Sequence, residues 1–397
     1  MPSQDDAIVL IDGARTPFGR FGGALSSLSA QQLGARAIAG ALGRAAIDPA
    51  RVDQVIVGQV LTAGGGQLTA RVAATEAGIP MGTPALNINR MCLSGVDAIM
   101  LAQQTIATGQ ADVIVAAGQE SMSNAPHLLP GSRRGFRYGT APLIDHLEFD
   151  GLQDAFTEQS MGALTESRNA EYGVLREQQD AYAVESHRRA AQAAAAGLFD
   201  GEIVPVTISG RGGDQVVDAD EGIRADVTAE GLAGLRPAFA PDGSLTAGNS
   251  SPISDGAAAV VVARRSVAEK LGVPWLAELG AGAVVAGPDS GLHEQPANAI
   301  AKACSRENLA VGDVDLVEIN EAFAAVVLAS RDRLGLDQDQ LNVNGGAIAL
   351  GHPIGTSGAR ISLHLARELG RRGASRGVVA LCGGGGQGQA LVLRAAS

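Results

Sequence analysis

The sequence predicts an α/β protein built from two similar halves, with an extra segment inserted into the first half. Three observations point to this fold. Two stretches of the chain repeat each other, each copy alternates helix-like and strand-like segments, and the stretch between the copies has a different character. Such alternation builds sheets of parallel strands covered by helices. A chain of 397 residues is also long enough for two or three domains with a large core.

The composition indicates a folded protein with tight turns and an acidic surface. Glycine accounts for 53 residues, whereas aromatic residues make up only 3%, so the core must be packed with aliphatic side chains and the backbone must turn sharply. The 30 basic and 42 acidic residues give a net charge of −12, without a long basic run. This balance argues against a protein that binds the phosphate backbone of a nucleic acid.

The three cysteines are Cys92, Cys304 and Cys382, too few and too scattered for a disulfide framework or a zinc site. The N-terminus lacks the basic and apolar segments of a signal peptide, and no apolar run approaches the ~18 residues of a membrane span. We therefore expect a cytoplasmic protein that binds neither a metal nor a membrane.

The repeat is clearest between residues 37–57 and 299–319, which align without a gap at an offset of 262 and share eight identical residues. Chance could produce such a match between two alanine-rich helices, but the order of the flanking features argues against chance. In each copy a strand-like stretch ends in Asn-X-Asn, a Ser-Gly pair opens a helix, and a buried strand follows; the three pairs of segments are 87–89 and 342–344, 94–95 and 357–358, and 112–118 and 377–383.

The offset between the copies predicts the domain organisation. The first half comprises residues 1–120 plus 249–268, the inserted segment 121–248, and the second half 269–397. Within the insertion we expect one long helix from about residue 158 to Gly197, since glycine commonly ends a helix. The last strand of the first half is predicted at 255–263.

Cys92 stands between a strand-like stretch and the helix that opens at Ser94. A helix N-terminus stabilises a thiolate and lowers the pKa of the thiol, which would make Cys92 a nucleophile. A small, buried core residue is an equally good interpretation. Cys304 lies in a repeated helix and is expected in the core.

His352 lies in a glycine-rich stretch ahead of a helix, where the backbone holds it and an imidazole can transfer protons near neutral pH. Cys382 ends a strand and precedes four glycines, whose backbone N–H groups could form an oxyanion hole, although a flexible loop is the alternative. Asn320 lies where a strand passes into a helix, either as a helix cap or to orient a water or a catalytic imidazole.

If the two copies pack about a pseudo-twofold axis, the helix starts near Cys92 and Thr356 point at one central site. That site would gather Cys92, His352, Cys382 and Asn320. A Cys–His pair activates a nucleophile, and a second cysteine beside it would transfer a proton at carbon.

Together these motifs resemble the thiolase family over essentially the whole chain. The matching segments are DGARTPFGRFGG (12–23), GQVLTAGGGQ (58–67), NRMCLSG (89–95), LRPAF (235–239), TAGNSSPISDGAAA (246–259), NEAFA (320–324), GGAIALGHPIGTSGAR (345–360) and CGGGGQG (382–388). The stretch around residues 125–156 is most similar to the short-chain branch, the acetyl-CoA acetyltransferases. The resemblance implies a five-layered αβαβα core of two similar halves with an inserted loop domain.

The resemblance also implies an acyltransferase that interconverts two acetyl-CoA with acetoacetyl-CoA and coenzyme A through an acyl-cysteine. It implies that no metal or redox cofactor is needed and that the enzyme works in fatty acid metabolism. It also implies a homo-oligomer, either a dimer or a dimer of dimers, the latter being a homotetramer.

By resemblance, Cys92 carries the acyl group, His352 deprotonates it, and Cys382 takes or returns the proton at the α-carbon. His352 and a water held by Asn320 would form one oxyanion hole, and the backbone N–H groups of Cys92 and Gly384 the other. The positions that match the coenzyme A channel are Met161, Leu235, Ala238, Phe239, Ala247, Ser251, Ala322 and Phe323.

Two positions depart from many short-chain members, which have His at Ser160 and Gly at Pro252. The stretch SSPISDG is closer to degradative 3-ketoacyl-CoA thiolases of broader chain length, which is therefore the alternative function. A decarboxylating ketosynthase would use two histidines, and a non-catalytic acyl-CoA or lipid-binding protein would tolerate the loss of Cys92 or Cys382.

Arg133, Arg134 and Arg137 form the densest basic cluster of the insertion. Coenzyme A is an anion and the protein carries a net negative charge, so these arginines are candidates for the positive field at a coenzyme A entrance. A solvated loop, or an assembly loop without a role in ligand binding, is the alternative.

Overall fold

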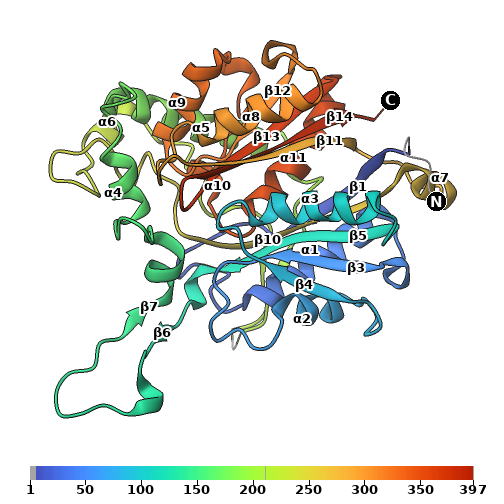
Figure 1. The fold of residues 1–397 in the computed structure, drawn as a ribbon, viewed down its shortest axis with the longest axis horizontal. Helices are drawn as coiled ribbons and strands as arrows, with labels where there is room; N and C mark the ends of the chain where they lie inside the picture. The colour runs from blue at the N-terminus through green and yellow to red at the C-terminus, as the bar shows by residue number, and fades with distance from the viewer. Residues whose placement is uncertain (1–5, 211, 397) are drawn as a thin grey trace.

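The computed structural model describes residues 6–210 and 212–396 and confirms the α/β fold of two similar halves (Figure 1). Residues 1–5, part of the N-terminus in which the sequence predicts no signal peptide, lie outside the described residues. Over the described chain, no helix has both the length and the apolar character that crossing a membrane requires. The exact domain boundaries stay a prediction.

Each half contributes a half-sheet, and the two half-sheets repeat the same strand order outward from their shared edge. The first runs β1 (Ile8–Arg15), β10 (Ser254–Arg264), β5 (Val113–Ser121), β3 (Gln54–Gly58) and β4 (Ala85–Ile88), with β2 (Gly19–Arg20) beside β10. The second runs β11 (Ala277–Ala286), β14 (Gln387–Ala395), β13 (Arg376–Gly383) and β12 (Leu316–Ile319). A short antiparallel pairing of β1 with β11 joins them.

The strands are only partly parallel, because the pairs β3–β4, β3–β5 and β12–β13 are parallel and the others are antiparallel. The expectation of parallel sheets is therefore wrong for the strands nearest the junction. The reason is visible in the second half, where β13 returns directly into β14 through a glycine turn instead of a crossover helix.

The layers are those that the family resemblance implies (Figure 1). Helices α3 (Ser94–Ala107) and α11 (Ser357–Arg372) lie between the half-sheets and contact each other. Helices α1 (Ala30–Ala45) and α2 (Thr69–Glu76) cover one outer face, and α8 (Gln295–Arg306) and α9 (Ala324–Leu334) cover the other. Helix α7 (Arg265–Leu271) follows β10, and the short α10 (Ala347–Leu350) precedes the His352 loop.

The two central helices cross at their N-termini, and glycine makes this approach possible. A Cβ at Gly95 would lie 2.6 Å from the backbone nitrogen of Ala359, and a Cβ at Gly358 would lie 2.2 Å from that of Val96. Side chains at either position would push the helices apart. The predicted convergence of the two helix starts is therefore confirmed.

The repeat is confirmed down to its short helices: 3₁₀ turns at Pro49–Arg51 and Val311–Asp313 occupy equivalent places before β3 and β12. One equivalence is wrong, because the Asn-X-Asn at 342–344 ends no strand. Only a single bridge, between Val317 and Leu341, stands where β4 would have its counterpart.

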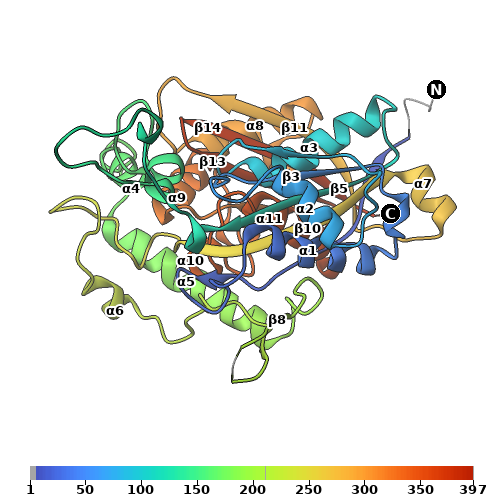
Figure 2. The same cartoon turned by 90° about the horizontal axis from the view of Figure 1, so that it is seen from below.

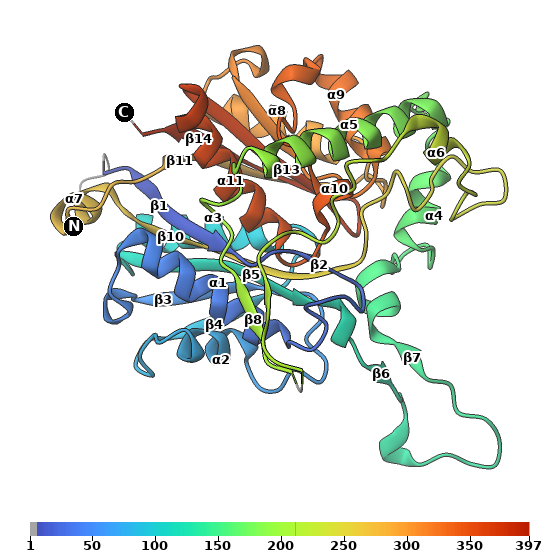
Figure 3. The ribbon, with the colours of Figure 1, turned by 180° about the vertical axis from the view of Figure 1, so that it is seen from behind.

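The insertion forms a projecting hairpin and a cover over one side of the core (Figures 2 and 3). Its elements are the hairpin strands β6 (His127–Leu128) and β7 (Ile144–Asp145), a π-helical turn (Leu147–Leu152), α4 (Met161–Glu166), α5 (Arg176–Ala195), β8 (Val206–Ile208), β9 (Gln215–Val217) and α6 (Ala229–Ala233), with 3₁₀ turns at Met122–Asn124 and Ser132–Arg134. A further 3₁₀ turn, Gln338–Gln340, belongs to the second half.

The single long helix expected from about residue 158 to Gly197 is wrong, because α4 and α5 are separate. The chain between them turns through Gly173, whose φ of +63° suits a residue without a side chain. The predicted stop is confirmed, since α5 ends at Ala195 and Gly197 follows with a φ of +69°.

A buried ionic network fastens the insertion to the core. Arg15 of β1 donates two hydrogen bonds to Asp220, at 2.7 and 2.9 Å, and its Nε lies 3.8 Å from Glu202. The other oxygen of Glu202 lies 3.1 Å from Nδ1 of His364 on α11. Burial opposes ionisation, but the charges of His364 and Arg15 outweigh it and hold the pKa of Glu202 at about 2.

We expect Glu202→Gln to lower the free energy of unfolding by about 3–5 kcal/mol, because it removes the buried carboxylate that pairs with His364 and leaves Arg15 with Asp220 alone. Chemical denaturation measures the loss. A matched control is Glu171→Gln, which breaks an exposed pair with Arg168 and should cost at most about 1 kcal/mol. Equal effects would contradict the role of the network.

The low pKa of Glu202 also predicts how the network responds to acid. The pKa is lower in the folded than in the unfolded state, so the contribution of Glu202 is full above pH ~4.5 and is lost as pH falls toward 2. The stability difference between wild type and Glu202→Gln should shrink over that range.

Candidate active site

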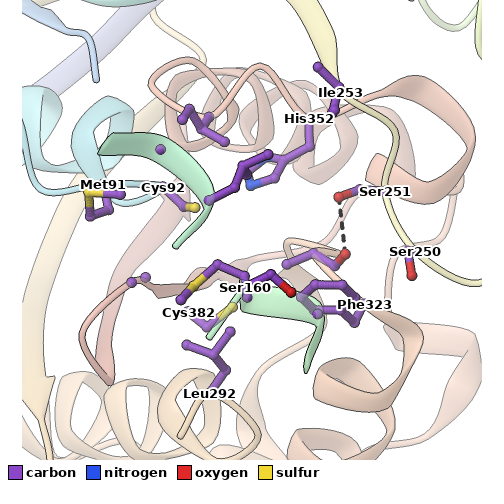
Figure 4. Close-up of a pocket in the computed structure, with 18 of the residues that line it drawn as sticks. Met91, Cys92, Ser160, Ser250, Ser251, Ile253, Leu292, Phe323, His352 and Cys382 are labelled. Carbon is purple, nitrogen blue, oxygen red and sulfur yellow. Dashed lines mark hydrogen bonds between the residues drawn. The ribbon is translucent and has the colours of Figure 1, made fainter. Parts of the chain in front are cut away.

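An apolar cavity of about 210 Å³ lies where the N-termini of α3 and α11 converge. Figure 4 shows Cys92 and His352 on one side of it and Cys382 on the other. Nine of the residues proposed from the sequence line this cavity, namely Cys92, Met161, Phe239, Ser251, Ala322, Phe323, His352, Cys382 and Gly384. Three channel candidates, Leu235, Ala238 and Ala247, are exposed and lie outside it.

Cys92 lies two residues before α3, in a turn where the preceding Met91 has a φ of +52°. Burial raises the pKa of its thiol to about 12, and the negative charge of Glu120 adds to this effect. The backbone N–H groups of Cys92 itself and of Gly384 act in the opposite direction. The predicted lowering of the pKa is therefore wrong, because desolvation outweighs the helix N-terminus.

His352 is a buried, neutral imidazole with one nitrogen held and the other free. Its Nδ1 lies 2.6 Å from Oγ of Ser357 and 3.4 Å from Nδ2 of Asn320, whereas Nε2 has no hydrogen-bond partner. Burial, followed by the charge of Arg360, lowers its pKa to about 3. An uncharged ring with a free nitrogen in a cavity can accept a proton from a neighbouring thiol.

Cys382 ends β13 and is almost completely buried. Burial raises the pKa of its thiol, and a thiolate at Cys92 would raise it further, so the two sulfurs act on each other. The glycines that follow form a turn that packs against the backbone at Asp289. A Cβ at Gly386 would lie 1.8 Å from the carbonyl oxygen of Asp289. This turn places Gly384 beside both cysteines in the cavity wall.

Asn320 lies behind His352, fully buried, and its Oδ1 has no partner. The loop that carries it is held by Glu321, which accepts hydrogen bonds from Tyr182 at 2.8 Å and Ser186 at 2.7 Å on α5. Sequence reasoning missed Glu321 as an anchor to the insertion. In the sequence Glu321 stands in the NEAFA motif directly after Asn320, and nothing in that motif indicates that it binds Tyr182 and Ser186.

Sequence reasoning also missed Ser357, although it placed the helix start at the Ser-Gly pair. Which side chain a helix-start serine holds depends on the path of the preceding loop.

Over residues 6–210 and 212–396, no group of three or more His, Cys, Asp or Glu side chains is arranged to hold a metal ion.

Two family models cover nearly all of the chain. The model of the thiolase N-terminal domain matches residues 8–266, and that of the thiolase C-terminal domain matches residues 273–395. The chain belongs to the thiolase family. This confirms the resemblance carried by the motifs, and the protein is an enzyme of the thiolase type.

Several thiolases resemble this one over almost their full length. The probable acetyl-CoA acetyltransferase of Mycolicibacterium smegmatis is 60% identical over 387 residues, which are 97% of this chain and 100% of that protein. The acetyl-CoA acetyltransferase of Chromobacterium violaceum is 49% identical, covering 97% and 99% of the two chains. The crystal structure of the Bacillus anthracis acetyl-CoA acetyltransferase superposes with a TM-score of 0.96 at 40% identity, covering 98% and 99%.

Proposed function

We propose that this thiolase is an acetyl-CoA C-acetyltransferase, which interconverts two molecules of acetyl-CoA with acetoacetyl-CoA and coenzyme A. The observation that carries the proposal is the meeting of Cys92, His352 and Cys382 in one apolar cavity. A nucleophile, a base and a second acid–base group suffice for acyl transfer followed by carbon–carbon bond formation. The similarity to proteins named acetyl-CoA acetyltransferase supports the choice of substrate.

In the first half-reaction, Nε2 of His352 takes the proton of Cys92, and the thiolate attacks the thioester carbon of acetyl-CoA. The oxyanion of the tetrahedral intermediate accepts hydrogen bonds from the backbone N–H groups of Cys92 and Gly384, the same groups that act on the Cys92 sulfur. When the intermediate collapses, coenzyme A leaves as a thiolate and takes the proton of Cys382. The products are acetyl-Cys92, protonated His352 and a Cys382 thiolate.

In the second half-reaction, Cys382 removes a proton from the α-carbon of another acetyl-CoA. The enolate oxygen accepts a hydrogen bond from Nε2–H of His352 and from a water held by the side-chain amide of Asn320, which is buried behind the ring. The carbanion attacks the acetyl group, and the released Cys92 thiolate takes back the proton from His352. Thiolysis follows the same steps in reverse, so protons balance in both directions.

The substrate channel follows from the residues around the cavity. Met161, Phe239 and Phe323 supply an apolar wall, and Ser251 donates hydrogen bonds from its backbone N–H and hydroxyl to the carbonyl oxygen of Ala322, at 3.1 and 3.0 Å, as Figure 4 shows for the hydroxyl. We propose that coenzyme A passes this wall. The exposed channel candidates would lie at its outer end; they are Leu235, Ala238 and Ala247.

A broader-chain 3-ketoacyl-CoA thiolase is the second candidate, and Ser160 favours it. Where many short-chain members have His, Ser160 lines the cavity, and its hydroxyl accepts a hydrogen bond from the backbone N–H of Ala163 at 3.2 Å. An assay that follows coenzyme A-dependent loss of acetoacetyl-CoA, repeated with a longer 3-ketoacyl-CoA, separates the two. A higher kcat/KM for the longer substrate would replace the first proposal with the second, and no cleavage of either would reject both.

We further propose a homo-oligomer, a dimer or a homotetramer, that works in the cytoplasm in fatty acid metabolism. It uses acyl-CoA and coenzyme A and needs neither a metal nor a redox cofactor. The projecting β6–β7 hairpin supports subunit contact, since Phe136 and Tyr138 are exposed on it (Figure 3). Light scattering measures the assembly.

Arg133, Arg134 and Arg137 lie exposed on the same hairpin. If they attract the anionic coenzyme A, replacing all three by Gln raises KM for acyl-CoA at least about threefold at low salt and leaves kcat nearly unchanged. The difference should vanish at high salt, because the Debye length falls from ~10 Å at 0.1 M to ~3 Å at 1 M. Parallel salt curves with an intact oligomer would assign the hairpin to assembly alone.

A further inference from the structure

Ser357 is the first residue of α11 and is completely buried beside the catalytic loop. Its Oγ lies 2.6 Å from Nδ1 of His352 and 3.3 Å from the carbonyl oxygen of Pro353. The opposite ring nitrogen, Nε2, has no protein partner. The hydroxyl is thus the strongest polar contact of the imidazole, and the direction of this hydrogen bond decides which ring nitrogen carries the proton.

The carbonyl of Pro353 helps to decide this direction, because a carbonyl oxygen only accepts. When the hydroxyl of Ser357 donates to it, Oγ is left to accept from Nδ1–H of His352, and Nε2 carries no proton. The opposite arrangement would protonate Nε2, which has no acceptor. Asn320 agrees with the first arrangement if its amide ends are exchanged, so that its unpaired Oδ1 faces the ring.

In the first half of the molecule Ser94 makes the equivalent hydrogen bonds, and there the donor and acceptor of each bond are fixed. Ser94 is the first residue of α3 and precedes the crossing glycine, as Ser357 does in α11. Its Oγ accepts from the backbone N–H of Arg90 at 2.8 Å, so its hydroxyl must donate to the carbonyl oxygen of Met91 at 2.7 Å. Each helix-start serine therefore accepts from the catalytic loop and donates to a carbonyl of that loop.

We propose that Ser357 is a positioning residue that keeps a proton on Nδ1 of His352, so that Nε2 alone exchanges a proton with Cys92. The inference rests on the proposed thiolase reaction. Nδ1–H stays hydrogen-bonded to Ser357 whether the ring is neutral or protonated, so the ring does not reorient between the two half-reactions. A neutral ring with the opposite tautomer could not accept the Cys92 proton at Nε2.

The tautomer is directly measurable in wild-type protein labelled with ¹⁵N-histidine. His352 is assigned by the loss of its signals in His352→Gln. We expect the shifts of a neutral ring protonated at Nδ1 in wild type, and a gain of the Nε2–H form in Ser357→Ala. A wild-type ring protonated at Nε2 would overturn the proposal, and this measurement needs no Ser357 variant to fold.

Kinetics test the consequence for catalysis. In Ser357→Ala, acetylation of Cys92 by acetyl-CoA should slow roughly ten- to a hundredfold, with KM within about twofold of wild type, since Ser357 does not line the cavity. Ser357→Thr keeps a hydroxyl and should restore most of the rate. Ser362→Ala is the control: Ser362 is buried on the same helix but donates to the carbonyl of Gly358 at 2.7 Å, and its loss should leave acetylation unchanged.

Acetylation by Ser357→Ala within twofold of both wild type and Ser362→Ala would overturn the proposal. If wild type itself never acetylates Cys92, the proposed function fails instead. The ¹⁵N shifts still decide which ring nitrogen of His352 carries the proton, and so test the role of Ser357 separately.

Discussion

Cys92→Ala abolishes covalent acetylation and lowers kcat for acetoacetyl-CoA cleavage by at least about 10³-fold, because the protein loses the cavity thiol on which the backbone N–H groups of Cys92 and Gly384 both act. Mass spectrometry after incubation with acetyl-CoA should place the acetyl group on Cys92 in wild type. Acetyl on Cys304 or Cys382, and never on Cys92, would contradict this assignment.

Two companion variants sharpen the test. Cys304→Ala is the matched control, because Cys304 packs in the core beneath β11 and β14 and should be dispensable while the fold survives. His352→Ala should impair acetylation while Cys92 remains in place. Normal acetylation without His352 would refute its role as the base.

Cys382→Ser separates the two half-reactions, and its effect on condensation should be nearly as large as that of removing Cys92, about 10³-fold. The variant still acetylates Cys92, because His352 remains to accept the proton and coenzyme A can leave as a thiolate that takes a proton from water instead of from Cys382. It fails to exchange the α-protons of bound acetyl-CoA with deuterium, because a serine hydroxyl is a far weaker acid than a thiol. Exchange at the wild-type rate would mean that Cys382 is not the base at carbon.

The sequence predicted much of the fold because both copies kept the same order of helices and strands. The buried strands β5 and β13 and the Ser-Gly helix starts lie where the repeat predicted them, and two matched 3₁₀ turns fall within its aligned segments. The strand directions nearest the junction were not predictable from local pattern, because a glycine turn in one half is replaced by a long insertion in the other.

The candidate site was predictable in its members but not in its electrostatics. Cys92, His352 and Cys382 stand in distinctive motifs, so their meeting follows from the pseudo-twofold arrangement. The pKa of Cys92 depends on how thoroughly the cavity is desolvated and on Glu120 of β5, which no local motif indicates. Ser357 and Glu321 were missed for the same reason, since their partners are set by tertiary packing.

The crossing of α3 and α11 has a consequence for how the two halves share the chemistry. Aligned on the helix-start serines Ser94 and Ser357, the counterpart of Cys92 is Gly355 and that of His352 is Asn89. Strand register likewise makes Gln119 the counterpart of Cys382. The two halves thus meet at equivalent crossing glycines but carry different residues around them. Two separate copies of one half would present identical residues on both sides, whereas a single chain lets one half supply the nucleophile and the other the base.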